Sequence, residues 1–561
     1  MPSLTRTKTL FAFTSPRSPE KLIPEVRLLT ENFSGQIWEG GDGVQADFYD
    51  VLFDSDFFQG TDRKIDRDKK AFAARDRITR APKSLGFVKL GGDIQLTDPG
   101  RKFIEENEIE DLFARQLMKF QLPSPYHTQS KGDHFCIKPY LELLRFIRAV
   151  GSVSKKEVAL FFVPVIDHNL LDEEITKLKA FREEIKNRGG EEYDEIVENK
   201  LREKIEKVYE KEIEDGTFDT REGDDDKDHI GSKVRNLKDY ADAFIRYLML
   251  TGLISFERGT YNIRIAPLKD EEVDFLLDTV DPTPTSFESL EDFQDYLFNV
   301  NRPQLFYDES GRVIEKIRKL NFHYNADNKG LDELRIDLQD LLSANLQEAV
   351  DRERIITQSD EGYEDILNTF NQISRKEIIN APLILEWNVY RVFLSMNYAV
   401  EVKGNFKQDA NGLPLHFAPG KLPDIEINYD EFELIVEVTM SGGQTQYRME
   451  NESVPRHFGR KRNNSAKPVY CLFIAPKISD GTLAHFFNLN KMNTDFYGGK
   501  TNIIPLSIDS LIELFRRSKI AEFSRSQLLR EWMQGLLDEN QHAEGERSWY
   551  KRVNESVPGW C

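Results

Sequence analysis

Alternating apolar and polar residues predict two short β-hairpins in the first half of the chain. In the first, strands over Gly86–Leu90 and Asp93–Thr97 flank a Gly-Gly turn, and a helix begins at Asp98. In the second, two alternating strands follow a helix that ends near Gly252. A hairpin that follows a helix is typical of the wing of a winged helix-turn-helix, so the pattern predicts two winged-helix-like units. Such units bind DNA in some proteins and pack against protein in others.

Helical periodicity fills most of the sequence between and after these hairpins. Tyr140–Phe162 is predicted as two helices broken at Gly151, the second with Ser154 as its N-cap and Glu157 completing a capping box. Residues 282–374 are also helical but polar and show no chemistry, which indicates a linker region.

A charged helical hairpin separates the two wing-like units. Asp172–Glu214 carries scattered apolar residues among alternating charges, with a break at Gly189-Gly190. Residues 171–228 hold 22 Asp and Glu against 12 Lys and Arg, about half of the excess behind the net charge of −21. The run Asp224–Asp226 is interpreted as a surface loop. Overall charge therefore does not exclude a nucleic-acid partner.

The last third of the chain has the pattern of a mixed α/β core. Strand-like runs alternate with helical ones, and they cover Tyr398–Lys403, Asp424–Ile427, Glu433–Thr439, Val469–Ala475 and Asn502–Leu506.

Two carboxylates in this core form a candidate metal site. Asp424 begins one predicted strand, and Glu437 lies inside the next, flanked by apolar residues. Adjacent antiparallel strands would bring them together, and paired carboxylate oxygens suit Mg²⁺. Alternatively, Glu437 faces solvent on an edge strand and Pro423-Asp424 is only a turn. Glu386, in an apolar helical stretch, and Glu450 and His457, beyond the second strand, would complete a cluster of acids with one base; each alone is more often a surface acid or a core histidine.

Composition excludes several other classes of protein. The sequence contains no run of 18 apolar residues, so we expect no membrane span. The three cysteines (Cys136, Cys471 and Cys561) have no zinc-finger or disulfide spacing, and the N-terminus has no secretion signal, so we expect a cytoplasmic protein. The sequence has no phosphate-binding GxxxxGK[ST] loop and no methyltransferase motif, so we expect no nucleotide cofactor and no methyltransferase activity.

Several long segments resemble the AlwI-type type IIS restriction endonucleases, which include the PleI and MlyI enzymes and related site-specific nicking endonucleases. The longest is PDIEINYDEFELIVEVTMSGGQTQYRMENESVPRHF, which begins at Pro423. The others are Ser15–Glu25, Ala73–Phe87, Phe113–Pro125, Gly231–Ile254 and Tyr470–Pro476. The resemblance extends over most of the chain.

The resemblance implies a multidomain α+β protein with a winged-helix-like recognition region and a PD-(D/E)xK nuclease domain. The expected domains are a first recognition subdomain over residues 1–138, a second over residues 139–280 that includes the acidic helical segment 171–228, a helical linker over residues 281–375 and the nuclease domain over residues 376–561.

The resemblance also assigns the site residues. Asp424 and Glu437 match the metal-binding acids, Glu386 and Glu450 match additional active-site acids, and His457 matches the histidine that follows. The lysine expected two residues after Glu437 is replaced by Thr439. Glu450, His457, Gln446 or a second metal ion could take over its role.

The implied function is that of a prokaryotic, Mg²⁺-dependent type IIS restriction endonuclease. It would bind a short asymmetric site in double-stranded DNA and hydrolyse the backbone a few base pairs downstream. Cutting both strands would require a transient homodimer or a second nuclease subunit. Without either, the chain would be a strand-specific nicking endonuclease or the large subunit of a heterodimeric enzyme.

Basic residues near the first wing are the candidate DNA contacts, because arginine can bind guanine or phosphate. They are Arg75, Arg77 and Lys83, followed by Arg17 and Lys21. An ordinary surface ion pair is the alternative for each. For the whole chain, the alternatives are a non-catalytic winged-helix DNA-binding regulator, which metal-dependent nicking would exclude, and a protein-interaction scaffold, which failure to bind duplex DNA would favour.

Overall fold

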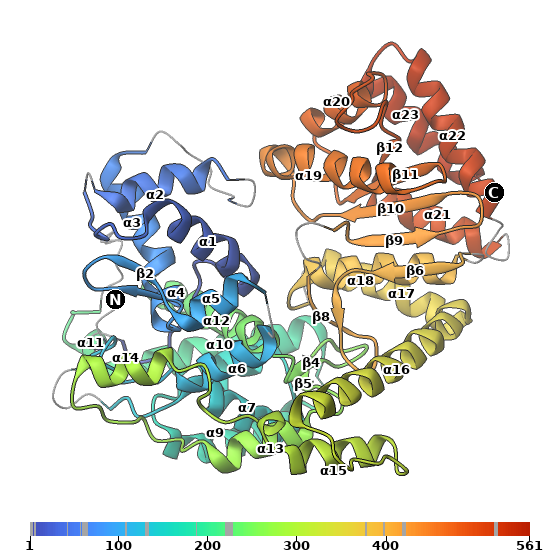
Figure 1. Ribbon diagram of the computed structural model, residues 1–561. Coiled ribbons are helices and arrows are strands. Elements are labelled where there is room, and N and C mark those ends of the chain that lie inside the picture. The colour runs from blue at the N-terminus through green and yellow to red at the C-terminus, as the bar shows by residue number, and fades with distance from the viewer. Residues whose placement is uncertain are drawn as a thin grey trace. The chain divides into compact units, whose positions relative to one another are not determined.

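The computed structural model describes the chain except for residues 1–3, 5–6, 42, 56–57, 59–64, 107–108, 130–133, 187, 219–227, 376–377, 397–398, 418–421, 521–525 and 561. The chain forms two compact units, residues 1–342 and residues 343–561 (Figure 1). Both contain helices and β-sheet, so the chain is a multidomain α+β protein, as predicted from its sequence. In the described residues, no helix is long and apolar enough to cross a membrane.

The first unit begins with a small helical group that includes the first predicted hairpin. Strands β1 (Val88–Leu90) and β2 (Ile94–Leu96) pair antiparallel, and Thr97 caps the next helix by accepting a hydrogen bond from the Gly100 backbone N–H. A side chain at Gly100 would collide with the Phe87 carbonyl oxygen, so glycine allows the helix to approach the strand. The helices here are α1 (Leu22–Phe33), α2 (Val44–Phe53), α3 (Arg67–Thr79), α4 (Ala81–Ser84), α5 (Asp98–Ile104) and α6 (Ile109–Lys119).

The second predicted hairpin is confirmed and gains a third strand. Strands β4 (Ile254–Phe256) and β5 (Ile263–Ile265) pair antiparallel, and the two-residue strand β3 (Ser152–Val153) joins on the other side of β5. The predicted Ser154–Glu157 capping box is present at the start of α8. The helices of this part are α7 (Pro139–Val150), α8 (Lys155–Glu157) and α12 (His229–Met249).

The predicted charged hairpin is inserted between α8 and α12. It consists of α9 (Leu171–Ile185), α10 (Gly190–Val208) and the short α11 (Glu210–Glu214), and α10 packs against α12. The acidic run Asp224–Asp226 lies outside the described residues. Helix α13 (Asp270–Thr279) follows the second hairpin and was not predicted. Polar helices then follow, as predicted: α14 (Leu290–Phe298), α15 (Ser310–Leu320) and α16 (Leu331–Gln358).

The second unit is built around a mixed five-stranded sheet in the order β12-β11-β10-β9-β6. Strand β10 pairs antiparallel with β9 and parallel with β11, which in turn pairs parallel with β12. Every residue of β11 is buried, which explains its unbroken apolar sequence. The strands are β6 (Glu401–Gly404), β7 (Lys407–Gln408), β8 (Pro414–His416), β9 (Ile425–Asn428), β10 (Glu433–Val438), β11 (Val469–Ala475) and β12 (Ile503–Ser507).

Helices flank this sheet (Figure 1). Helix α18 packs on β6 and β10, α19 packs on β11, and the helices after β12 pack on the far edge. Four of the five strands of the sheet fall within a residue or two of the predicted runs. Strand β6 begins three residues after the predicted start, Tyr398, which lies outside the described residues. The helices are α17 (Asp360–Ser374), α18 (Ala381–Ser395), α19 (Gly443–Asn464), α20 (Asp480–Leu489), α21 (Ile508–Ile520), α22 (Ser526–His542) and α23 (Glu546–Ser556).

Candidate active site

The antiparallel pairing of β9 and β10 brings Asp424 and Glu437 together. Ile425 is the register partner of Val436, so the residue before β9, Asp424, lies level with Glu437. One Asp424 carboxylate oxygen accepts a hydrogen bond of 2.7 Å from the backbone N–H of Val438. Asp424 is half-buried and Glu437 is buried, so the pair lies at the end of the hairpin with Asp424 nearer to solvent.

Helix α19 adds Glu450 and His457 to this pair. These residues are seven apart, which is two helical turns, so they lie on the same face of α19. The Nδ1 atom of His457 lies 2.7 Å from a carboxylate oxygen of Glu437. The hydroxyl of Thr439, just after β10, forms a hydrogen bond with the Glu450 carboxylate. Residues from three elements therefore meet at one place.

Three crowded carboxylates, one buried and two half-buried, give this site its electrostatic character. Burial raises the pKa of Asp424, and the charge of Glu437 raises it further. Burial and the Glu450 charge likewise raise the pKa of Glu437, and burial raises that of Glu450. Three such groups cannot all ionise in a low dielectric without a counter-charge. The site therefore takes up protons or a cation.

One cation near the acids was not predicted from the sequence. The positive charge of Arg456, the residue before His457, partly offsets the rise in the pKa of Glu437 that burial and Glu450 cause. Its guanidinium also forms an ion pair with Glu452 at 2.8 Å. The signal in the sequence is only its position in the same helix as the two predicted site residues.

Glu386, the remaining predicted acid, lies on α18. Its side chain is only 6% exposed, and α18 packs on β10, the strand that carries Glu437. The structure thus brings together Asp424, Glu437, Glu450 and His457, and it places Glu386 on a neighbouring helix.

Gln446, one candidate to replace the missing lysine, has a structural role instead. Its amide nitrogen donates to the carbonyls of Ser441 and Lys477, both at 2.9 Å, and its amide oxygen accepts from the backbone N–H of Ser479 at 2.7 Å. The side chain is fully buried. These bonds join the loop after β10 to the loop after β11, which leaves Glu450 and His457 as the candidates with reactive groups.

The five predicted DNA contacts differ in their surroundings. Arg75 is exposed on α3, with its guanidinium over the ring of exposed Phe72. Arg77, two residues later, is bound to the fully buried carboxylate of Glu25, which indicates a structural role. Burial lowers the pKa of Lys83, whose ammonium lies 4.6 Å from the centre of the Tyr126 ring.

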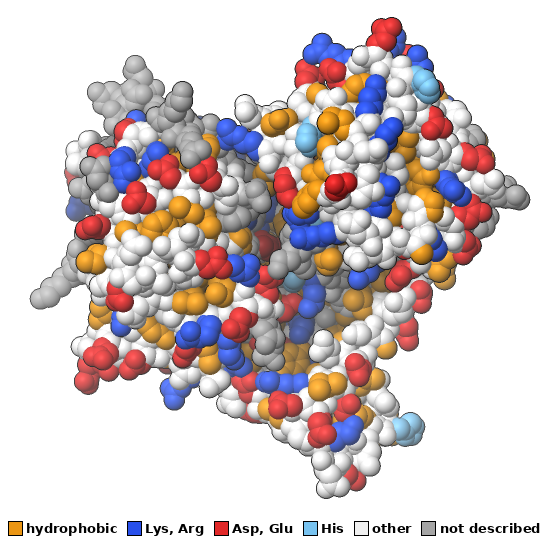
Figure 2. Space-filling model, turned by 45° about the horizontal axis from the view of Figure 1, so that its top comes forward, with side chains coloured by type: hydrophobic (Ala, Val, Ile, Leu, Met, Phe, Trp, Pro, Cys, Tyr) orange, Lys and Arg blue, Asp and Glu red, His pale blue; other side chains and the backbone are white. Residues whose placement is uncertain are grey.

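Arg17 and Lys21 also have neighbours within the first unit. Arg17 pairs with Asp239 at 3.0 Å, and burial, then the charge of Arg77, lowers the pKa of Lys21. Acidic and basic side chains are interspersed over the face shown in Figure 2. Arg75 is therefore the candidate whose surroundings leave it best placed to contact a ligand.

Comparison with known proteins identifies the family. The model of the AlwI restriction endonuclease family matches residues 83–514, well over half of the chain. No curated protein matches. Two solved structures align with this chain. The small subunit of the heterodimeric restriction endonuclease R.BspD6I is 25% identical with a TM-score of 0.30, and the alignment covers 34% of this chain and 98% of the subunit. The BpuJ1 endonuclease binding domain, solved with modified DNA, is 15% identical with a TM-score of 0.31, and the alignment covers 52% of this chain and 96% of the domain. The extent of the family match shows that this chain belongs to the AlwI restriction endonuclease family and is a DNA nuclease.

Proposed function

We propose that this chain is a type IIS restriction endonuclease that cleaves double-stranded DNA a few base pairs downstream of a short asymmetric site, using Mg²⁺, in the cytoplasm of a prokaryotic cell. The observation that carries the proposal is the cluster of carboxylates with His457 at the end of the β9–β10 hairpin. Helices flank the mixed sheet beneath it, as expected for a PD-(D/E)xK domain.

The cluster fits a bound Mg²⁺ ion. Asp424 and Glu437 supply the hard oxygen ligands that this ion prefers, and half-buried Asp424 is open to solvent. The pKa values of Asp424 and Glu437 are both raised, so these carboxyls hold protons that a bound dication would replace. When bound, Mg²⁺ would supply Lewis-acid stabilisation at the phosphorus and a more acidic water.

The chain's own residues would orient the acids and accept a proton. His457, through Nδ1, holds Glu437 in a fixed orientation, and with Glu437 ionised the ring N–H is the donor. Thr439 occupies the place of the missing lysine and binds Glu450. Glu450 thus contacts the residue that stands in place of the lysine, and we assign it the role of that lysine. Its raised pKa suits a base that takes the proton from the attacking water.

Of the two winged-helix-like units, the first is the better candidate to read DNA. Helix α3, which only the short α4 separates from this wing, packs on α2 and buries only Ala71, Ala74 and Ile78. The corresponding helix of the second winged-helix-like unit, α12, is covered by α10 and by α8. A recognition helix must present an open face to the major groove. We therefore place DNA recognition at α3 and the β1–β2 turn, within the first of the four proposed domains (residues 1–138, 139–280, 281–375 and 376–561).

Replacing Arg75 with alanine is expected to weaken specific DNA binding by about tenfold or more. An exposed guanidinium on α3 can bind a base or a phosphate, and its loss removes that contact. Titrations at several salt concentrations measure the effect, since loss of a phosphate contact lowers the salt slope by about one. Arg188→Ala, in the acidic hairpin, is the matched control and should bind like wild type. Equal affinity for the Arg75 variant would contradict the assignment.

The decisive test of function is cleavage of supercoiled plasmid with Mg²⁺ and with chelator, followed by run-off sequencing of the ends. Mg²⁺-dependent cuts at a fixed offset from one motif would support the proposal. Cuts on one strand would indicate the nicking alternative, or a large subunit that lacks its partner. Cuts on both strands would indicate a transient homodimer. Specific binding without cleavage under any metal would instead favour a winged-helix regulator.

A further inference from the structure

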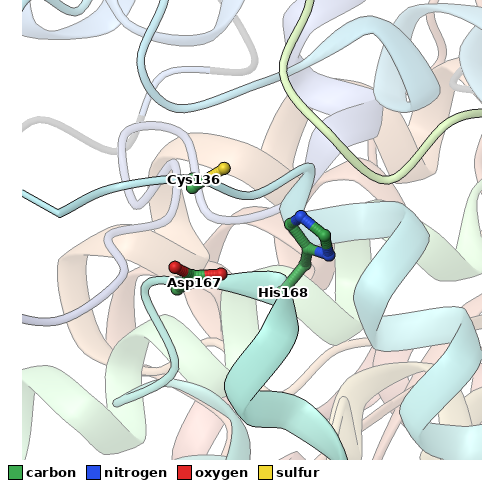
Figure 3. Close-up of side chains that lie close together, drawn as sticks. All are labelled: Cys136, Asp167 and His168. Atoms are coloured by element: carbon green, nitrogen blue, oxygen red, sulfur yellow. The ribbon is translucent and has the colours of Figure 1, made fainter.

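A second cluster of potential metal ligands lies in the first unit, built by Cys136, Asp167 and His168. One ligand atom from each side chain lies within 4.8 Å of the others, and all three residues are half-buried (Figure 3). Cys136 lies in the extended segment before α7, and Asp167 and His168 open the short 3-10 helix His168–Leu170. The cluster belongs to neither the nuclease site nor the proposed DNA-reading surface.

The backbone holds the three residues in register. The Cys136 N–H donates to the carbonyl of Ile166, and the His168 N–H donates to the carbonyl of Cys136, both at 2.9 Å. One oxygen of Asp167 accepts hydrogen bonds from the backbone and side-chain nitrogens of Asn169, which orients the carboxylate. These bonds hold the two backbone segments against each other, so the three side chains stay next to one another.

Asp281 is a fourth candidate ligand from a distant part of the chain. Val280 and Pro282, the residues on either side of Asp281, line one pocket together with His168, so Asp281 lies in a segment next to the cluster. Burial, and then the negative charges of Asp167 and Asp281, raises the pKa of the Cys136 thiol. A bound dication would neutralise these two carboxylates.

We propose that Cys136, Asp167 and His168, with Asp281 or water as the fourth ligand, form a structural Zn²⁺ site. The donor set of one thiol, one imidazole and one carboxylate suits Zn²⁺, whereas Mg²⁺ prefers oxygen ligands alone. Ligand atoms around tetrahedral Zn²⁺ are about 3.5 Å apart, roughly an ångström less than the 4.8 Å limit of the cluster. On binding, the Cys136 thiol loses its proton to solvent and its sulfur coordinates the ion.

The ion would tie together two segments of the chain, and a third if Asp281 is the fourth ligand. Cys136 precedes α7, Asp167 and His168 precede the acidic hairpin, and Asp281 follows α13. Asp167 and His168 are consecutive in the sequence, and only one cysteine takes part. The familiar spacing of paired zinc ligands is therefore not visible in the sequence. The site would stabilise the second winged-helix-like unit without taking part in DNA hydrolysis.

Co²⁺ titration of the metal-stripped full-length protein, with excess Mg²⁺ present, tests this proposal. Wild type should show thiolate-to-Co²⁺ charge-transfer absorption in the near ultraviolet, and added Zn²⁺ should remove it. Cys136→Ser should abolish this band, and His168→Gln should weaken Co²⁺ binding by at least about tenfold. Cys471→Ala, the control, should leave both the band and the Co²⁺ affinity unchanged.

Co²⁺ absorption is measured without DNA cleavage, so this test of the metal site does not depend on the proposed nuclease function. Absence of the band in wild type, or its persistence in Cys136→Ser, would overturn the site. If Cys136→Ser does not fold by circular dichroism, unchanged Co²⁺ affinity in His168→Gln would overturn it equally. Zn²⁺ should also raise the melting temperature of wild type but not that of either ligand variant.

Discussion

Replacing Asp424 with asparagine should abolish DNA cleavage while leaving site-specific binding intact. Asparagine keeps an oxygen that can accept the Val438 N–H bond, so the hairpin end should keep its structure, but the negative charge that would hold the metal ion is lost. Metal-ion stabilisation of the transition state is worth several kcal/mol, so the rate should fall by about a thousandfold or more. Single-turnover cleavage and a binding titration measure the two effects separately.

Glu431→Gln is the matched control for this variant. Glu431 lies in the turn at the other end of the same hairpin, exposed and paired with Arg530, so its loss should leave cleavage unchanged. Glu437→Gln should behave like Asp424→Asn. Cleavage at the wild-type rate by either variant would refute the assignment of the active site.

The Asp424→Asn substitution should also stabilise the metal-free protein at neutral pH. The pKa of Asp424 is raised in the folded state, mainly by burial, so its contribution to stability is full below the unfolded pKa and is lost as the pH rises through the folded pKa. The melting temperature of metal-free wild type should therefore decline as the pH rises above about 4, and that of Asp424→Asn should decline less. Mg²⁺ should raise the melting temperature of wild type but not of the variant.

The active-site strands were predictable because one apolar pattern decides both their existence and their pairing. The run before Glu437 is apolar enough to require burial, and a short turn after β9 allows only antiparallel pairing with β10. Asp424 and Glu437 thus become neighbours by local rules alone. Strand β3 has only two residues, too few for an alternating pattern, and was not predicted.

The rest of the site depends on how α19 docks, which no local pattern specifies. The contact of Thr439 with Glu450 and the approach of Arg456 to Glu437 both require the helix to pack across the sheet. A similar limit applies to Arg75 and Arg77. They are two residues apart on α3 and so point to different faces, and only the tertiary structure shows which face meets buried Glu25.

Replacing Arg391 with methionine should destabilise the second unit by about 3–5 kcal/mol, the cost of removing one partner from a buried ion pair. Its guanidinium is fully buried on α18 and forms ion pairs with Glu353 on α16, at 2.7 Å, and with Asp365 on α17. It also stacks on Trp387. The melting temperature should fall by roughly 10 °C. Arg547→Met, which removes an exposed ion pair with Asp480, should change stability by less than about 1 kcal/mol.

The double variant Glu353→Met with Arg391→Met separates the two possible causes of this loss. If the single variant is unstable because a buried carboxylate is left without its cation, replacing that carboxylate as well should restore most of the stability, since Asp365 is partly exposed and can remain solvated. If stability stays low in the double variant, packing of Arg391 on Trp387 accounts for the loss instead. Either way α18 carries Glu386 and packs on β10, so a shift of this helix should also lower the cleavage rate. Unchanged melting in Arg391→Met would show that the three helices hold together without the ion pairs.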